Sequence, residues 1–140
     1  MDVDILHGIT RAINAEWPDY EIHTNKLKQD VVEPCFFVQP IYNNQKHYPC
    51  GRINYDTNFL IQILCEQMST SDKIKMGNRL HEILDVIDLG NGEKLRGRNK
   101  NFNVYEYCVN FSVDYIGFIT EPNETEMFID DLKINTIIGG

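Results

Sequence analysis

The chain has 140 residues, of which 42% are hydrophobic, and its formal net charge is -8. This length suits one domain with a sizeable core. Residues 1–70 hold five basic and nine acidic side chains, and residues 71–140 hold eight and twelve, so neither half is basic. Phosphate-backbone binding needs clustered Lys and Arg. We therefore expect no specific nucleic-acid binding, and we interpret the basic run at 94–100 as a solvated hairpin.

No apolar run approaches the ~20 residues of a membrane span. The start, Met1-Asp2-Val3-Asp4, lacks the basic residues of a secretory signal. We expect a soluble protein that is made in a cytoplasm and does not bind membranes.

Two helices are predicted. Residues 2–16 carry Ile5, Ile9 and Ile13 at helical spacing, and Trp17-Pro18 ends this helix. The second helix starts with Ser71 as its cap and ends before Gly90. Its apolar stripe consists of Met76, Leu80, Ile83, Leu84 and Ile87.

Strands are predicted between and after these helices. A weak one spans 20–27, and an apolar one spans 35–39, stopped by Pro40. Residues 43–52 are polar and rich in turn formers, which indicates a loop. A long run, 53–65, alternates apolar and polar residues, which is typical of a strand with one buried face.

A closing hairpin is expected from residues 95–115. Its turn is placed at 97–101, and its second strand, 107–115, alternates as the first long run does. Together the elements predict an α+β fold of two layers, with two main helices packed on one mostly antiparallel sheet of 4–5 strands.

The last residues change character. We predict one domain over 1–118 and an acidic, aliphatic C-terminal arm over 119–140. Phe128, Ile129 and Leu132 make a purely disordered tail improbable on composition. Two alternatives stay open: the arm folds on its own domain, or it packs on a neighbouring subunit.

Catalytic and metal chemistry find little support. No two of the four cysteines form a CxxC pair, so no metal site is expected, and we interpret them as reduced thiols. The one local cluster with nucleophile potential is His47 with Cys50, in the predicted loop. No phosphate-binding Gly loop is present. We expect no enzyme activity and no cofactor.

The order of these patterns resembles a known family. The first helix carries Ile5, Ile9, Ala12 and Ile13, and Glu33-Pro34-Cys35-Phe36-Phe37-Val38 follows a weak strand. A Tyr-rich loop then leads into the strand from Tyr55 to Cys65. A capped helix from Ser71 to Leu89 and a final hairpin ending at Asn110–Tyr115 complete the pattern. Over residues 2–117 it is similar to the tail terminator (tail completion) proteins of phages and prophages of Gram-positive bacteria.

The resemblance implies a structural virion protein of the tail. Such proteins form a ring, typically hexameric, at the head-proximal end of the tail tube, having assembled in the host cytoplasm. The ring stops tube polymerisation and offers a surface to the head–tail connector and, in contractile tails, to the sheath. No cofactor or reaction is involved. DNA passes through the lumen, and acidic residues there would repel it; unchanged DNA ejection after their charge reversal would count against this.

Candidate partner-binding residues are His47, Tyr48 and Arg52 in the 43–52 loop, for the tube or the connector, and Phe128, Ile129 and Leu132 in the arm. The plain alternative for the loop is a solvated segment without a partner. Two alternative functions stay open: another head–tail joining or neck protein, and a cytoplasmic small-molecule-binding or thiol enzyme.

Overall fold

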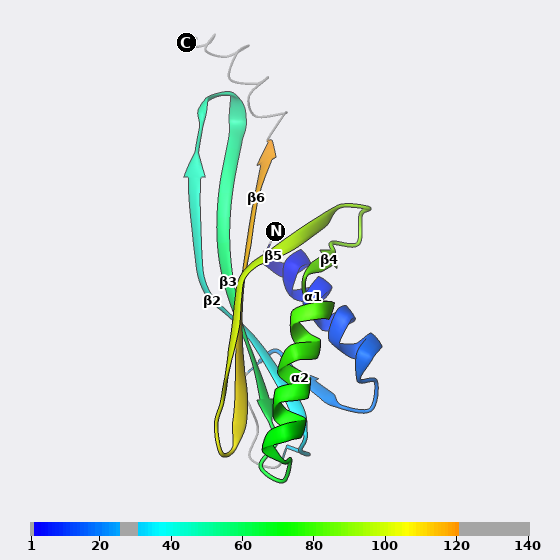
Figure 1. Cartoon of the computed structure of the whole chain (residues 1–140). Helices are drawn as coiled ribbons and strands as arrows, with labels where there is room; N and C mark the ends of the chain where they lie inside the picture. The colour runs from blue at the N-terminus through cyan, green and yellow to red at the C-terminus, as the bar shows by residue number, and fades with distance from the viewer. Residues whose placement is uncertain (1, 26–30, 121–140) are drawn as a thin grey trace. The chain divides into compact units, whose positions relative to one another are not determined.

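The computed structural model describes residues 2–25 and 31–120. Contacts within the chain divide it into two units. Unit 1 comprises Met1–Asn43 and Thr57–Ile116, and unit 2 comprises Asn44–Asp56 and Gly117–Gly140. The elements in chain order are α1 (Asp2–Glu16), β1 (Glu21–His23), β2 (Cys35–His47), a 3-10 turn (Pro49–Gly51), β3 (Arg52–Leu64), α2 (Thr70–Ile83), β4 (Val86–Asp88), β5 (Lys94–Val104) and β6 (Cys108–Thr120) (Figure 1).

The strands form one sheet in the order β1-β2-β3-β6-β5-β4. β1 pairs with β2 in parallel, whereas β4–β5 and β5–β6 are antiparallel. Side-chain bonds from Asn58 to Ser112 and from Gln62 to Asn110 show that β3 and β6 also run in opposite directions. The α+β prediction is therefore confirmed, with six strands in the described residues instead of four or five.

The alternation predicted for the two long runs is confirmed. In β3 the odd-numbered residues from Ile53 to Ile63 are buried, and the even-numbered ones are half-buried, apart from the exposed first residue, Arg52. Both helices lie on one face of the sheet in unit 1 (Figure 1). Their inner faces join the odd-numbered residues in the core, which includes Ile5, Ile9, Ile13, Met76, Leu80, Phe59, Ile61, Val109, Phe111, Val113 and Tyr115.

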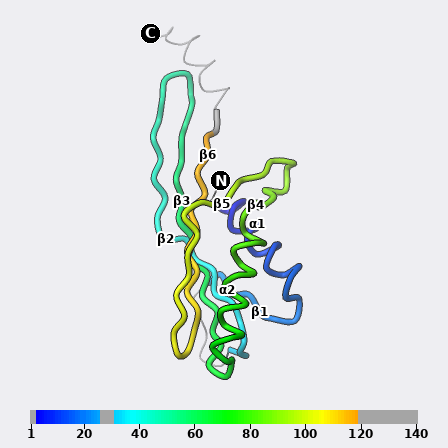
Figure 2. The backbone as a smooth tube through the Cα atoms, viewed as in Figure 1, coloured from blue at the N-terminus to red at the C-terminus, as the bar shows by residue number. Residues whose placement is uncertain are grey.

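Small residues let the helices approach the sheet closely. A Cβ atom on Gly8 would lie 2.8 Å from the backbone oxygen of Asp88, and one on Gly77 would lie 2.5 Å from the Phe102 ring. The end of α2 is fixed by the buried Tyr115, whose hydroxyl donates to the Leu84 carbonyl at 2.8 Å. Figure 2 follows the backbone from α1 into β1.

One histidine lies between α2 and the sheet. The rings of Phe102 and Phe111 meet His81 edge-on, with centroids 5.7 and 5.1 Å away. Burial, and secondarily the Lys100 ammonium, lower the pKa of His81 below its usual value of 6.5. Lys100 itself is paired with Asp85 at 2.6 Å. Neutral imidazole is therefore the form that the folded state favours.

This position predicts a pH-dependent stability. The folded-state pKa of His81 lies below the unfolded value. The neutral His81 side chain therefore contributes fully to the free energy of unfolding above about pH 6.5, and this contribution is lost progressively as the pH falls toward the folded pKa. We expect the free energy of unfolding, measured with urea, to fall less steeply for His81→Gln than for the wild type as the pH is lowered below about 6.5. The pKa of Asp85 is lowered, chiefly by its hydrogen bond from Lys100, so Asp85 titrates below this window. An identical slope in both proteins would contradict the prediction.

The N-terminal prediction is partly right. The helix at 2–16 is confirmed as α1. The strand expected at 20–27 is only Glu21–His23 among its described residues. The stop at Pro40 is wrong, because β2 continues to His47. β1 pairs with β2 only as far as Phe37, so Pro40 lies on an open sheet edge, where a missing N–H is tolerated.

The loop expected at 43–52 is right only for residues 48–51. Residues 43–47 complete β2, a short 3-10 turn spans Pro49–Gly51, and β3 begins at Arg52. The segment is therefore the tip of a β-hairpin.

The second helix is shifted and shortened. Ser69, not Ser71, caps it, because its hydroxyl accepts from the Asp72 amide at 3.1 Å. The helix ends at Ile83 and not before Gly90. Val86–Asp88 form β4, in which Ile87 pairs with Leu95. This cross-strand pairing overrides the helical spacing of the apolar residues.

The closing hairpin exists, but its turn was misplaced. Residues 97–101 lie inside β5, where the register shifts between Arg98 and Asn101, and Asn99 takes a positive φ of 53°. The chain reverses at residues 105–107, where the Tyr105 amide donates to the Cys108 carbonyl at 2.8 Å.

Candidate interaction surfaces

The structure places three of the predicted partner-binding residues together. His47, Tyr48 and Arg52 all lie in the segment Lys46–Arg52, which we call the hairpin tip, in unit 2. All three are exposed. The other three, Phe128, Ile129 and Leu132, lie outside the described residues.

A tight backbone turn shapes the hairpin tip. The Tyr48 amide donates to the Arg52 carbonyl at 2.7 Å, which closes the turn. Cys50 and Gly51 have φ values of 68° and 75°. Glycine adopts this left-handed region without steric cost, whereas a cysteine there is uncommon. The local turn formers that suggested a loop therefore build a defined reversal.

Cations and rings are paired at the hairpin tip. The Arg52 guanidinium carbon lies 4.3 Å from the centroid of the Phe118 ring, and its Nε donates to Asn54 Oδ1 at 3.3 Å. The Lys46 ammonium lies 5.6 Å from the Tyr48 ring. Such cation–π contacts orient both partners. A pocket of about 340 Å³ is lined by Tyr48, Arg52 and Asn54.

The hairpin tip is also a positive segment of an acidic chain. Residues 44–55 contain Lys46 and Arg52 and no Asp or Glu, against a net charge of -8 for the whole chain. Tyr and Arg are enriched among residues that dominate binding energy at protein interfaces. The hairpin tip is therefore suited to an acidic protein surface.

A second surface lies on the sheet face opposite α1 and α2 in unit 1. Polar side chains there bond across neighbouring strands, and we call this set the polar ladder. The amide of Asn58 donates to Ser112 Oγ at 3.0 Å and to Asp114 Oδ1 at 2.6 Å. The amide of Asn99 donates to Asp114 Oδ2 at 2.8 Å. The polar ladder is completed by a hydrogen bond of 3.1 Å from the side-chain amide of Gln62 to Asn110 Oδ1.

The polar ladder gives this face a fixed hydrogen-bonding pattern. Its members are half-buried, except Asp114, which is 8% exposed, and Asn99, which is exposed. Alternation in the sequence predicted a polar face, but the individual partners depend on strand register and could not be read from it.

A third surface was missed by sequence reasoning. The β5–β6 reversal, Tyr105–Tyr107, is here called the tyrosine turn, and its two tyrosines are 50% and 57% exposed. Lys73, on α2, is 4% exposed, and its ammonium donates to the carbonyls of Tyr105 and Glu106 at 2.9 and 2.6 Å. The turn is thus held on α2 while its rings face solvent. The sequence Tyr105-Glu106-Tyr107, which stands between two strands, could have indicated an exposed turn with two aromatic rings.

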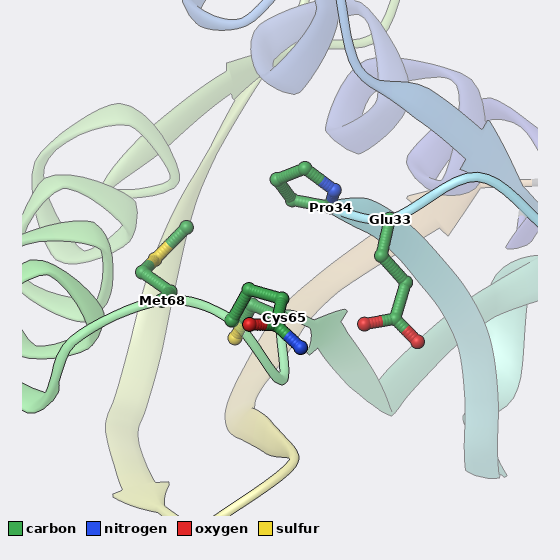
Figure 3. A pocket seen from close by; sticks show the side chains of 5 residues that line it. Glu33, Pro34, Cys65 and Met68 are labelled. Atoms are coloured by element: carbon green, nitrogen blue, oxygen red, sulfur yellow. The ribbon is translucent and has the colours of Figure 1, made fainter.

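An apolar pocket of about 190 Å³ lies next to the tyrosine turn. Glu33, Pro34, Cys65, Gln67 and Met68 line it. Figure 3 shows Pro34 and Glu33 on one chain segment, and Cys65 and Met68 on another. The Cys65 amide donates to the Tyr107 carbonyl at 3.0 Å, which joins the pocket wall to the turn. The Glu33 carboxylate accepts from the Glu66 amide at 3.1 Å.

The buried and half-buried thiols are not activated. Burial raises the pKa of Cys35, Cys65 and Cys108, so these three are held as thiols. Within residues 2–25 and 31–120, no group of three or more His, Cys, Asp or Glu side chains is placed to hold a metal ion. No helix in that same part of the chain is long and apolar enough to cross a membrane.

Comparison with known proteins agrees with a structural role. A search of curated proteins gave no match. A sequence model described as "Phage tail terminator protein" matches residues 4–127, which is most of the chain and reaches past the end of β6. This is a family of structural components of the virion tail, which interact with other tail and head components. The chain therefore belongs to the phage tail terminator protein family.

Proposed function

We propose that this chain is the ring-forming terminator of a phage tail. Copies close into a ring, hexameric as the family resemblance implies, that caps the head-proximal end of the tail tube and stops its polymerisation. The same ring provides the joining surface for the head–tail connector. The family match over residues 4–127 is the observation that carries this proposal.

The geometry is suited to such a role. A ring of identical subunits needs two different, complementary faces on each copy. The chain offers a basic hairpin tip, a polar ladder and the tyrosine turn as separate surfaces, all carried on strands and turns with defined hydrogen bonds.

The proposed partners follow from this position in the virion. They are further copies of the chain, the tail tube protein, the head–tail connector and, in a contractile tail, the sheath. Assembly takes place in the host cytoplasm, and we keep a Gram-positive host as a prediction. His47, Tyr48 and Arg52 are proposed to bind partners, as are Phe128, Ile129 and Leu132 of the C-terminal arm at 119–140.

Tube growth in vitro tests the proposal. Purified tail tube protein of the same phage or prophage is polymerised with increasing amounts of this chain, and tube lengths are measured by negative-stain electron microscopy. We expect amounts well below equimolar to shorten the tubes and to leave the chain at one tube end. Unchanged lengths at equimolar protein would contradict the proposal. Binding to the connector but not to the tube would point to a head–tail joining protein instead.

A further inference from the structure

We propose that the hairpin tip of one copy docks on the tyrosine turn and the apolar pocket of a second copy. The inference rests on the proposed assembly of this chain into a ring, and it names the two faces that meet. It also assigns the hairpin tip to a contact between copies, instead of to the tube or the connector.

Charge complementarity favours this pairing. Three exposed carboxylate residues belong to this face. Glu33 lines the apolar pocket, Glu66 lies between the pocket residues Cys65 and Gln67 in the chain, and Glu106 lies in the tyrosine turn. The nearby Lys73 ammonium is buried and directed at two backbone carbonyls, so the exposed charge of this face is negative. The hairpin tip carries Lys46 and Arg52 without an acidic neighbour in residues 44–55.

The apolar parts are also complementary. Tyr48 on the hairpin tip is 39% exposed, and Phe118, stacked on Arg52, is 59% exposed. An engineered cavity of roughly 150 Å³ is known to hold a benzene molecule. The apolar pocket of about 190 Å³ can therefore hold one aromatic ring, and Tyr48 is the ring that we assign to it. The rings of Tyr105 and Tyr107 would flank the contact.

Both faces are ordered before they meet. The Tyr48–Arg52 backbone bond closes the hairpin tip, and Lys73 holds the carbonyls of the tyrosine turn. Preorganised faces lose less conformational entropy on binding. Because the two faces differ, the contact is head-to-tail, so each copy can bind one neighbour through each face.

Mixing two variants tests the inference. A tip variant carries Tyr48→Ala and Arg52→Ala, and a turn variant carries Glu106→Ala and Tyr107→Ala. Native mass spectrometry and sedimentation are recorded for the wild type, for each variant alone and for an equal mixture. We expect the wild type to associate and each variant alone to be monomeric, with the dissociation constant raised about thirtyfold or more. The mixture should form dimers that stop at two copies, because only one intact pair of faces remains.

Matched controls use other exposed side chains. Arg98→Ala and Val86→Ala remove an exposed cation and an exposed apolar side chain elsewhere, and both should associate as the wild type does. Circular dichroism of every variant checks folding. Wild-type association should also weaken with salt, since exposed charges are screened.

Several results would overturn the inference. If both variants associate as the wild type does, copies meet through other faces, and the terminator role stands. If only the turn variant is monomeric, a segment of this chain other than the hairpin tip, such as 121–140, occupies the pocket. If the wild type is monomeric at all concentrations and still halts tube growth, the proposed contact is wrong and the terminator role stands. Failure of the proposed function is separate, because it requires that tube growth be unaffected.

Discussion

Phe111→Ala should lower the free energy of unfolding by about 3–5 kcal/mol, the range for deleting a large aromatic from a core. Phe111 lies on β6 with no exposed surface, and the ring of His81 meets it edge-on at 5.1 Å between centroids. Its removal leaves a cavity between α2 and the sheet. Urea denaturation followed by circular dichroism measures the change.

The same strand supplies a matched control. Phe118→Ala makes the identical substitution at a side chain that is 59% exposed and contacts Arg52. An exposed cation–π contact is worth about 0.5–1 kcal/mol, so the loss should not exceed this range. Equal losses at Phe111 and Phe118 would show that the burial pattern of β6 is wrong.

Asp114→Ala should cost about 2–4 kcal/mol, because each hydrogen bond to a charged group contributes about 1.5–3 kcal/mol and the freed amides regain part of this from water. Asp114 accepts from Asn58 at 2.6 Å and from Asn99 at 2.8 Å, on strands on either side of β6. It is the shared acceptor of the polar ladder.

A graded series separates this role from simple loss of a side chain. Ser112→Ala removes one neutral bond to Asn58 and should cost about 1 kcal/mol. Asp114→Asn keeps one acceptor oxygen, so its loss in the free energy of unfolding should lie between those of Ser112→Ala and Asp114→Ala. The three variants are compared by urea denaturation at neutral pH. A neutral Asp114→Ala would mean that water replaces both bonds and that the polar ladder does not stabilise the sheet.

Sequence periodicity identified the parts of the fold in which one face is buried. In unit 1, β3 and β6 alternate clearly because their odd-numbered residues face the helices. β2 beyond Pro40 is exposed on both faces, so its sequence shows no alternation of apolar and polar residues. Its turn-forming residues therefore predicted a loop. Only pairing with a neighbouring strand makes these residues extended.

Ambiguity of another kind affected the end of α2. Leu84 and Ile87 satisfy a helical stripe, whereas Ile87 and Leu89 equally satisfy a strand. The pairing of Ile87 with Leu95 decides in favour of the strand. The periodicity of the apolar residues alone does not show this pairing.

The interaction surfaces were predictable to different degrees. Turn formers marked residues 43–52 as a connection between strands, and His47, Tyr48 and Arg52 are exposed there, whereas their role as binding residues stays a prediction. The role of Lys73 could not be foreseen, since a lysine on a helix is usually solvated, and here it is buried against a turn more than 30 positions away, as its bonds to Tyr105 and Glu106 show.

Tail length in particles made without this chain tests the central claim most directly. The gene is inactivated in its phage or prophage, particles are induced, and tails are measured by electron microscopy, with the wild-type gene supplied in trans as the control. Our account predicts overlong tails of variable length that are not joined to heads, and restoration by the wild-type gene. Tails of uniform, normal length joined to heads in the absence of the chain would contradict it.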